Sequence, residues 1–151
     1  VDKKDLQPGD HIFAKRALAL YSHHGIYVGD KQVIHFNTPE EVIATIANEN
    51  PTLRLIPCGM CGYIRGSPGI GIMKTCIDHY GKKLYLYKYG VSWPKVLKSH
   101  GTCCPYQSKP LQEAVKTANE RLNGFGKCNL LASNCKHFAT FCSTGTTFSG
   151  Q

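Results

Sequence analysis

The chain has 151 residues, of which 42% are hydrophobic, and it carries a formal net charge of +8. This length favours a single domain over residues 1–151 with a core of its own, and the hydrophobic content argues against a disordered protein. No apolar run reaches the roughly 18–20 residues that a membrane-spanning helix needs. No motif of a nucleic-acid-binding protein is present, so we expect no nucleic-acid partner.

The positive charge is spread along the chain, with only short clusters such as Lys82-Lys83. A solvated basic surface accounts for this pattern, and the more specific alternative is that the charge attracts the protein to an anionic membrane surface. The chain begins with Val1 rather than Met, which favours a processed, secreted or vacuolar protein, with a cytoplasmic location as the alternative.

The first two thirds of the chain predict strands and turns. A turn at residues 6–10 leads into the first predicted strand, and Gly29-Asp30-Lys31 forms the centre of a predicted hairpin. Alternating or β-branched residues predict strands over 11–16, 25–28, 32–36, 41–46, 53–56 and 83–89, with an irregular Gly-, Pro- and Cys-rich loop over 57–75.

The last third predicts helices. Ser108 is suited to cap a helix that Pro110 helps to start, and Gly124 fits the position after its end. Its apolar face is formed by Leu111, Val115, Ala118 and Leu122. A second helix is predicted to begin near Asn134, with Cys135, Phe138 and Cys142 on one side. Strands first and helices last indicate an α+β fold.

Cys135 is the candidate nucleophile, because the dipole and the free N–H groups of a helix start stabilise a thiolate. His23 and His35 flank the predicted hairpin turn, so we expect them to lie close together. One imidazole then serves as the base and the other fixes its tautomer. The alternative is structural, since cysteines are often buried for packing and strand histidines are often satisfied core residues.

Short motifs add a family resemblance. The segments His23-His24-Gly25-Ile26-Tyr27-Val28-Gly29-Asp30, Val33-Ile34-His35, Asn134-Cys135-Lys136-His137-Phe138 and Leu6-Gln7-Pro8-Gly9-Asp10 resemble the lecithin retinol acyltransferase domain. The plant members, also called NC-domain proteins, resemble nearly the whole chain, including its closing Phe141-Cys142-Ser143-Thr144-Gly145.

The resemblance implies a circularly permuted papain-like fold, with an antiparallel sheet packed against the C-terminal helices. It implies Cys135 as nucleophile, His23 as base and His35 as the residue that orients the base, with no cofactor for catalysis. It further implies a thiol-dependent acyltransferase or phospholipase A-type hydrolase, which takes an acyl group from a phospholipid or another acyl donor through an acyl-cysteine intermediate.

Two other functions stay open. A papain-like site also serves amide bonds, which makes a cysteine peptidase or amidase the enzymatic alternative. A non-enzymatic plant defence or storage protein on the same scaffold is the other.

A second group of residues has the spacing of a metal site. Cys58-x-x-Cys61 and Cys76-x-x-His79 are two short knuckles that could supply a tetrahedral Cys₃His set for a structural zinc ion. The alternative is a disulfide framework in a secreted protein. The plant relatives resemble this pattern with a cysteine in place of His79. That exchange preserves a zinc site but would break a disulfide.

Overall fold

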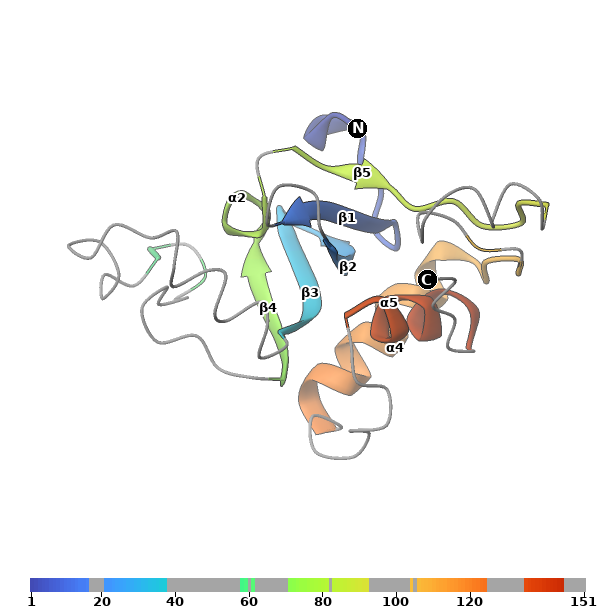
Figure 1. Cartoon of the computed structure of the whole chain (residues 1–151). Helices are drawn as coiled ribbons and strands as arrows, with labels where there is room; N and C mark the ends of the chain where they lie inside the picture. Colours follow the sequence, from blue (N-terminus) through green and yellow to red (C-terminus); the bar gives the residue numbers. More distant parts are fainter. Residues whose placement is uncertain are drawn as a thin grey trace.

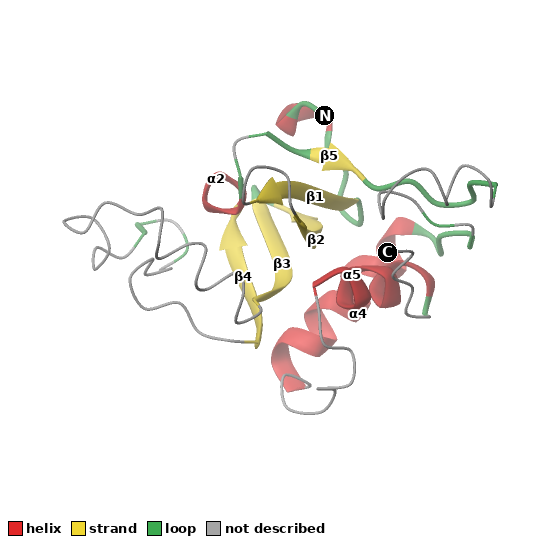
Figure 2. Ribbon diagram, viewed as in Figure 1, coloured by secondary structure: helices red, strands yellow, loops and turns green. Residues whose placement is uncertain are grey.

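The computed structural model describes residues 1–16, 21–37, 58–59, 61, 71–81, 83–92, 104, 106–124 and 135–145. The predicted strands over 41–46 and 53–56 lie outside these residues. Figures 1 and 2 show a sheet with two helices, α4 and α5, lying together beside it and the short helix α2 at its other end. The α+β class predicted from the order of the elements is confirmed.

Five antiparallel strands form one sheet in the order β4-β3-β2-β1-β5. Its strands are β1 (His11–Arg16), β2 (Tyr21–Gly29), β3 (Gln32–Asn37), β4 (Gly71–Cys76) and β5 (Tyr85–Leu86). The described helices are η1 (Lys3–Asp5), α2 (Ile77–Tyr80), α4 (Leu111–Gly124) and α5 (Cys135–Thr144). None of the helices in this described part is long and apolar enough to cross a membrane.

The hairpin of β2 and β3 is the best-predicted feature. Asp30 and Lys31 both adopt positive φ angles, 53° and 60°, as the tight turn of a two-residue hairpin requires. The turn sets the register in which Gly25 faces His35 and Ile26 faces Ile34. Strand β2 is longer than predicted, because it begins at Tyr21 and pairs with β1 along its whole first half.

One face of the sheet packs against α4 and α5. Ile26 and Ile34 contact the buried residues of the two helices, namely Ala114, Ala118, Phe138, Ala139 and Cys142. The small alanines allow the helix axes to approach the sheet closely. Because successive strand residues point to opposite faces, the neighbours of Ile26 and Ile34 in sequence lie on the other side.

The other face carries a second core under α2. Ile12, Ala14 and Val33 pack there against Ile77 and Tyr80. The β-sheet is therefore covered on both faces, by the C-terminal helices on one and by the α2 corner on the other.

Several predicted boundaries were wrong. The stretch 57–75 was expected to be a loop throughout, yet Gly71–Cys76 pairs with β3 as an edge strand. The predicted strand over 83–89 is reduced to Tyr85–Leu86, although the amide of Tyr87 still donates to the carbonyl oxygen of His11. Ser108 does not cap α4: its hydroxyl donates to the carbonyl oxygen of Lys109, and Gly124 closes the helix instead of following it.

Candidate active site

Two consecutive histidines of β2 point to opposite faces of the sheet. His23 lies opposite Ala14 of β1 and shares the face that α2 covers, whereas His24 lies opposite Phe13 on the face that α4 and α5 cover. Both side chains are buried, with 1% and 0% of their surface exposed. The strand thus separates two histidines that the sequence presents as one motif.

His23, His35 and Thr75 form a continuous chain of polar contacts across three strands. His23 Nε2 lies 2.9 Å from His35 Nδ1, and His35 Nε2 lies 3.1 Å from Thr75 Oγ1. The predicted proximity of the two histidines is confirmed, and all three side chains are buried. Thr75 was not predicted, because it falls in the segment that was expected to be a loop.

The contacts limit the proton arrangement. If His23 donates from Nε2, His35 accepts at Nδ1 and donates from Nε2 to the hydroxyl oxygen of Thr75. Every contact is then satisfied with two neutral imidazoles. In this arrangement Nδ1 is the basic nitrogen of His23, so a nucleophile's proton would go to Nδ1.

Tyr80 of α2 supports the same histidines. Its hydroxyl donates to the backbone carbonyl oxygen of His23 at 2.5 Å, and its ring lies 5.3 Å from the ring of His23 and 5.4 Å from that of His35. A buried tyrosine that keeps its hydroxyl bonded can line a polar site without leaving an unsatisfied group. The sequence carried no signal for this contact, since Tyr80 stands 57 residues from His23.

A second histidine pair lies on the opposite face. His11 Nε2 lies 2.7 Å from His24 Nδ1, and His11 Nδ1 lies 2.6 Å from the hydroxyl oxygen of Tyr89. His11 also stacks on Tyr87 at 4.0 Å. This group is a buried aromatic and polar cluster beneath the C-terminal helices.

Cys135 is the first residue of α5, as predicted from the sequence. Its side chain lies outside the described part of the structure. Helix α5 packs on the face opposite His23, through Phe138 on Ile26 and Ile34. Continuing the hairpin register brings His23 level with Asn37, where β3 ends.

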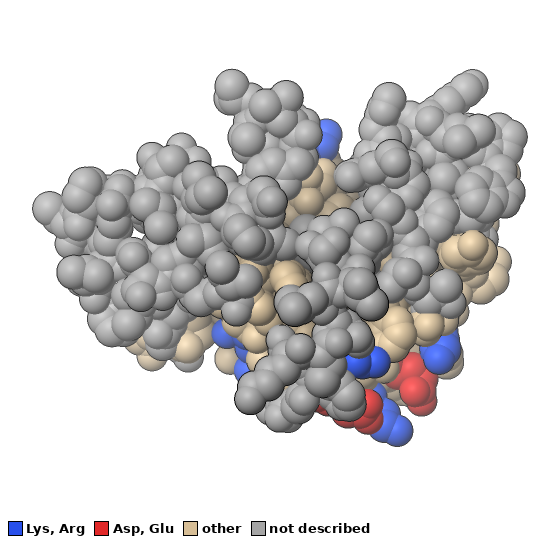
Figure 3. All heavy atoms as spheres, turned by 60° about the horizontal axis from the view of Figure 1, so that its bottom comes forward, with Lys and Arg blue, Asp and Glu red and all other residues tan. Residues whose placement is uncertain are grey.

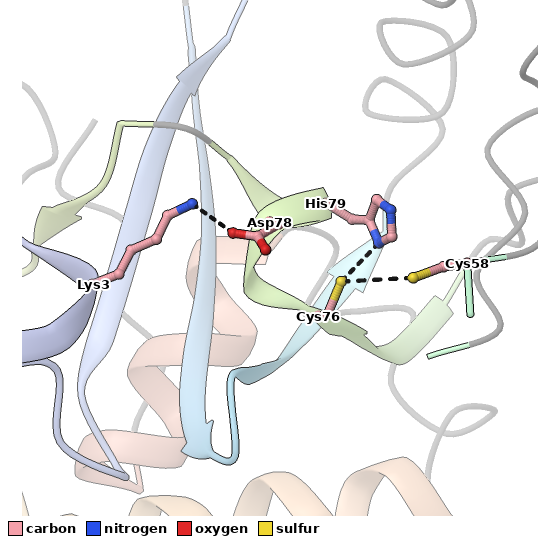
Figure 4. Close-up of polar contacts among 5 residues, drawn as sticks. All are labelled: Lys3, Cys58, Cys76, Asp78 and His79. Atoms are coloured by element: carbon pink, nitrogen blue, oxygen red, sulfur yellow. Dashed lines mark hydrogen bonds and ion pairs between the residues drawn. The ribbon is translucent and has the colours of Figure 1, made fainter. Parts of the chain in front are cut away.

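The four residues of the predicted metal site come together at the corner between β4 and α2. Figure 4 shows three of them, Cys58, Cys76 and His79. The ligand atoms of Cys58, Cys61, Cys76 and His79 all lie within 4.8 Å of one another. Burial raises the pKa of the Cys76 thiol above its usual value. The same corner carries the exposed ion pair between Lys3 and Asp78, 3.0 Å long, which lowers the pKa of Asp78.

The sequence model of the lecithin retinol acyltransferase family matches residues 4–148. The chain belongs to this family. The predicted resemblance is therefore confirmed over nearly the whole sequence.

Individual relatives agree with this membership. The chain is 33% identical over 156 residues to the protein LEAD-SENSITIVE 1 of Arabidopsis thaliana, an alignment that covers 95% of the chain and 60% of the relative. It is 27% identical over 130 residues to the lecithin retinol acyltransferase of Homo sapiens, with 86% of the chain and 52% of the relative covered. The chain thus spans between about half and three fifths of the length of these family members.

Proposed function

We propose that the protein is a cysteine-dependent acyl-transferring enzyme that takes an acyl group from a phospholipid or another acyl ester. Family membership supports acyl transfer as the class of reaction, since the animal relatives are named as lecithin retinol acyltransferases. The observation that carries the proposal is the buried chain from His23 through His35 to Thr75.

This row of contacts from His23 to Thr75 gives His23 the properties of an oriented base. When Nε2 of His23 donates to His35, the tautomer of His23 is the one whose Nδ1 accepts a proton. Thr75 fixes the ring of His35 in turn. A buried imidazole held in one tautomer is suited to proton transfer, which typically accelerates a reaction about 10²–10⁴-fold.

Cys135 is the proposed nucleophile. As the first residue of α5 it stands at the N-terminal end of the helix dipole, and a thiolate is favoured there. The free backbone N–H groups of the same turn could hold the negative oxygen of a tetrahedral intermediate.

The proposed reaction has two halves. Cys135 passes its thiol proton to Nδ1 of His23, and its sulfur attacks the ester carbonyl carbon. When the ester C–O bond breaks, the leaving alkoxide takes that proton and the acyl group remains as a thioester. Water or an acceptor amine or alcohol then loses a proton to His23 and attacks the thioester, and the released thiolate regains the proton.

We further propose that the fold is a circularly permuted papain-like one. The order of the functional residues supports it, since the histidines of β2 and β3 precede the nucleophile at the start of α5. A helix that starts with the cysteine and packs on an antiparallel sheet is the arrangement that this fold requires.

The test is direct detection of the acyl-enzyme. Incubation of the wild-type protein with a short-chain phosphatidylcholine should add the mass of one acyl group to Cys135, and hydroxylamine should remove it. Cys135→Ala should carry no adduct and show no turnover, while Cys142→Ala, a change in the helix core, should keep both. Absence of adduct and of lipid turnover, together with cleavage of a peptide panel, would replace the proposal by a peptidase. Inactivity on both would leave a non-enzymatic protein.

A further inference from the structure

The knuckle cluster, defined as Cys58, Cys61, Cys76 and His79, lies at the end of the sheet that carries the candidate base. We propose that it binds one structural zinc ion, and that this ion positions the two residues, Thr75 and Tyr80, that contact His35 and His23. The zinc site stands on its own geometry. Its link to catalysis rests on the proposed function.

Two separations within the knuckle cluster match the edges of a zinc tetrahedron, and a third is shorter. With Zn–S near 2.3 Å and Zn–N near 2.0–2.1 Å, ideal edges are about 3.8 Å between sulfurs and about 3.6 Å between sulfur and nitrogen. Cys58 Sγ lies 3.9 Å from Cys76 Sγ, and Cys61 Sγ lies 3.6 Å from His79 Nδ1. Cys76 Sγ and His79 Nδ1 are closer, at 2.9 Å, and would separate by about 0.7 Å to admit the ion.

The chemistry of the four donors favours zinc over a disulfide. The sulfurs of Cys58 and Cys76 lie 3.9 Å apart, far above the roughly 2.05 Å of a disulfide bond. Pairing two of the three thiols would leave the third thiol and the imidazole unused within the cluster, whereas all four donors together complete a closed Cys₃His site. A closed set leaves no open position for substrate, so the ion is structural.

The local backbone needs such a support. Helix α2 has only four residues, and its N-cap, Cys76, makes no side-chain capping hydrogen bond. A single helical turn is unstable by itself in water. Cys76 is the N-cap of this turn and His79 is its third residue, a spacing that lets both side chains reach one ion. Cys58 and Cys61 would connect the turn to a distant segment through the same ion.

The residues flanking these two ligands contact the candidate catalytic histidines. Thr75 precedes Cys76 directly and contacts His35, and Tyr80 follows His79 directly and donates to the backbone of His23. An ion that fixes Cys76 and His79 therefore also fixes their neighbours. Thr75 and Tyr80 act as positioning residues, because neither would touch the reacting atoms.

The metal is tested on the purified full chain, independently of activity. Elemental analysis should find about one zinc per chain, and replacement by cobalt(II) should give the charge-transfer absorption of a cobalt–thiolate site. His79→Cys should retain the metal as a Cys₄ site, whereas His79→Ala should lose it. Cys104→Ala, a buried cysteine outside the knuckle cluster, is the matched control and should retain it. Wild-type protein without metal, with Cys58 or Cys61 in a mapped disulfide, would overturn the proposal.

The positioning role is tested by hydrogen exchange on zinc-loaded and chelator-treated protein. Removal of zinc should accelerate amide exchange in residues 71–80 by roughly tenfold or more, while helix α4 keeps its protection as evidence that the domain is folded. His79→Cys should restore protection. Unchanged exchange in 71–80 after verified zinc loss would overturn the positioning role. These outcomes do not depend on turnover. A protein that binds zinc but is inactive would contradict only the proposed function, and an active protein without zinc would contradict only this inference.

Discussion

The hydroxyl of Tyr80 donates a hydrogen bond of 2.5 Å to the backbone carbonyl oxygen of His23. The same hydroxyl lies 3.3 Å from the carbonyl oxygen of Ile12, so one side chain of α2 joins the main chains of β1 and β2. Tyr80 is only 2% exposed, which makes these contacts part of the core under the sheet. The short helix α2 is thereby coupled to the position of the candidate base.

Replacing Tyr80 by Phe should lower the free energy of unfolding by about 1–2 kcal/mol, because a buried hydrogen bond is lost while the ring keeps its packing. Urea denaturation followed by circular dichroism measures this change. Tyr106→Phe is the control, since Tyr106 is 45% exposed and should change stability by less than about 0.5 kcal/mol. Equal effects of the two variants would contradict a structural role of the Tyr80 hydroxyl.

The two faces of β2 allow a test of which histidine is the base. His23→Gln should lower kcat/KM for a phospholipid by about 10²–10⁴-fold, the usual contribution of a general base. His24→Gln changes the neighbouring residue on the opposite face and should cost far less, measured at a temperature where both variants are folded. A larger loss for His24→Gln would move the base to the face that α5 covers.

Thr75 should affect the base through His35. Thr75→Val removes the hydroxyl that contacts His35 Nε2 but keeps the branched shape, so it should lower kcat with little change in KM. Thr75→Ser keeps the hydroxyl and should restore most of the rate. The pH dependence of kcat is the diagnostic measurement: a shift with Val that reverts with Ser marks a positioning role, and identical profiles would exclude it.

Local sequence signals predicted the elements that are set by local chemistry. The turn at Asp30 and Lys31 fixes the β2–β3 hairpin, and that register alone brings His23 and His35 together. The start of α5 at Cys135 was predicted from its capping residues in the same way. In a segment with a long apolar periodicity or a strong turn signal, contacts with distant parts of the chain rarely change the secondary structure.

Features that depend on distant partners could not be predicted. Strand β4 exists because Gly71–Cys76 finds the open edge of β3, and it follows directly on a Gly- and Pro-rich stretch that is typical of a loop. Tyr80 and Thr75 reach the histidines only after that pairing is made. The knuckle cluster was predicted all the same, because metal ligands leave a spacing signature in the sequence that does not depend on the surrounding fold.

Cys135 and Cys142 of the same helix should react very differently. Burial raises the pKa of Cys142 to about 12, so at neutral pH almost none of it is the reactive thiolate, and it is 1% exposed. Cys135 stands at the helix start, where a thiolate is favoured. Iodoacetamide at mildly acidic pH should therefore label Cys135 first and leave Cys142 unlabelled until the protein is unfolded, as peptide mass mapping can measure. Labelling of both at one rate would remove the argument for an activated nucleophile.

The net charge of +8 predicts attraction to an anionic lipid surface, which would concentrate the protein on its proposed substrate. Among the residues that are coloured in Figure 3, basic and acidic side chains lie near one another. Binding to vesicles should increase with the fraction of anionic lipid and decrease when salt is raised, because salt shortens the Debye length to about 8–10 Å at 0.10–0.15 M.

Two charge reversals separate net charge from a local patch. Lys15 of β1 and Lys116 of α4 are both exposed and lie on different elements. If the net charge governs attraction, Lys15→Glu and Lys116→Glu should weaken vesicle binding by similar factors, each lysine near the surface contributing on the order of 1 kcal/mol. A loss confined to one variant would indicate a docking patch around that residue. Equal binding to neutral and anionic vesicles would exclude an electrostatic contribution, and substrate would then have to be met without help from the protein's charge.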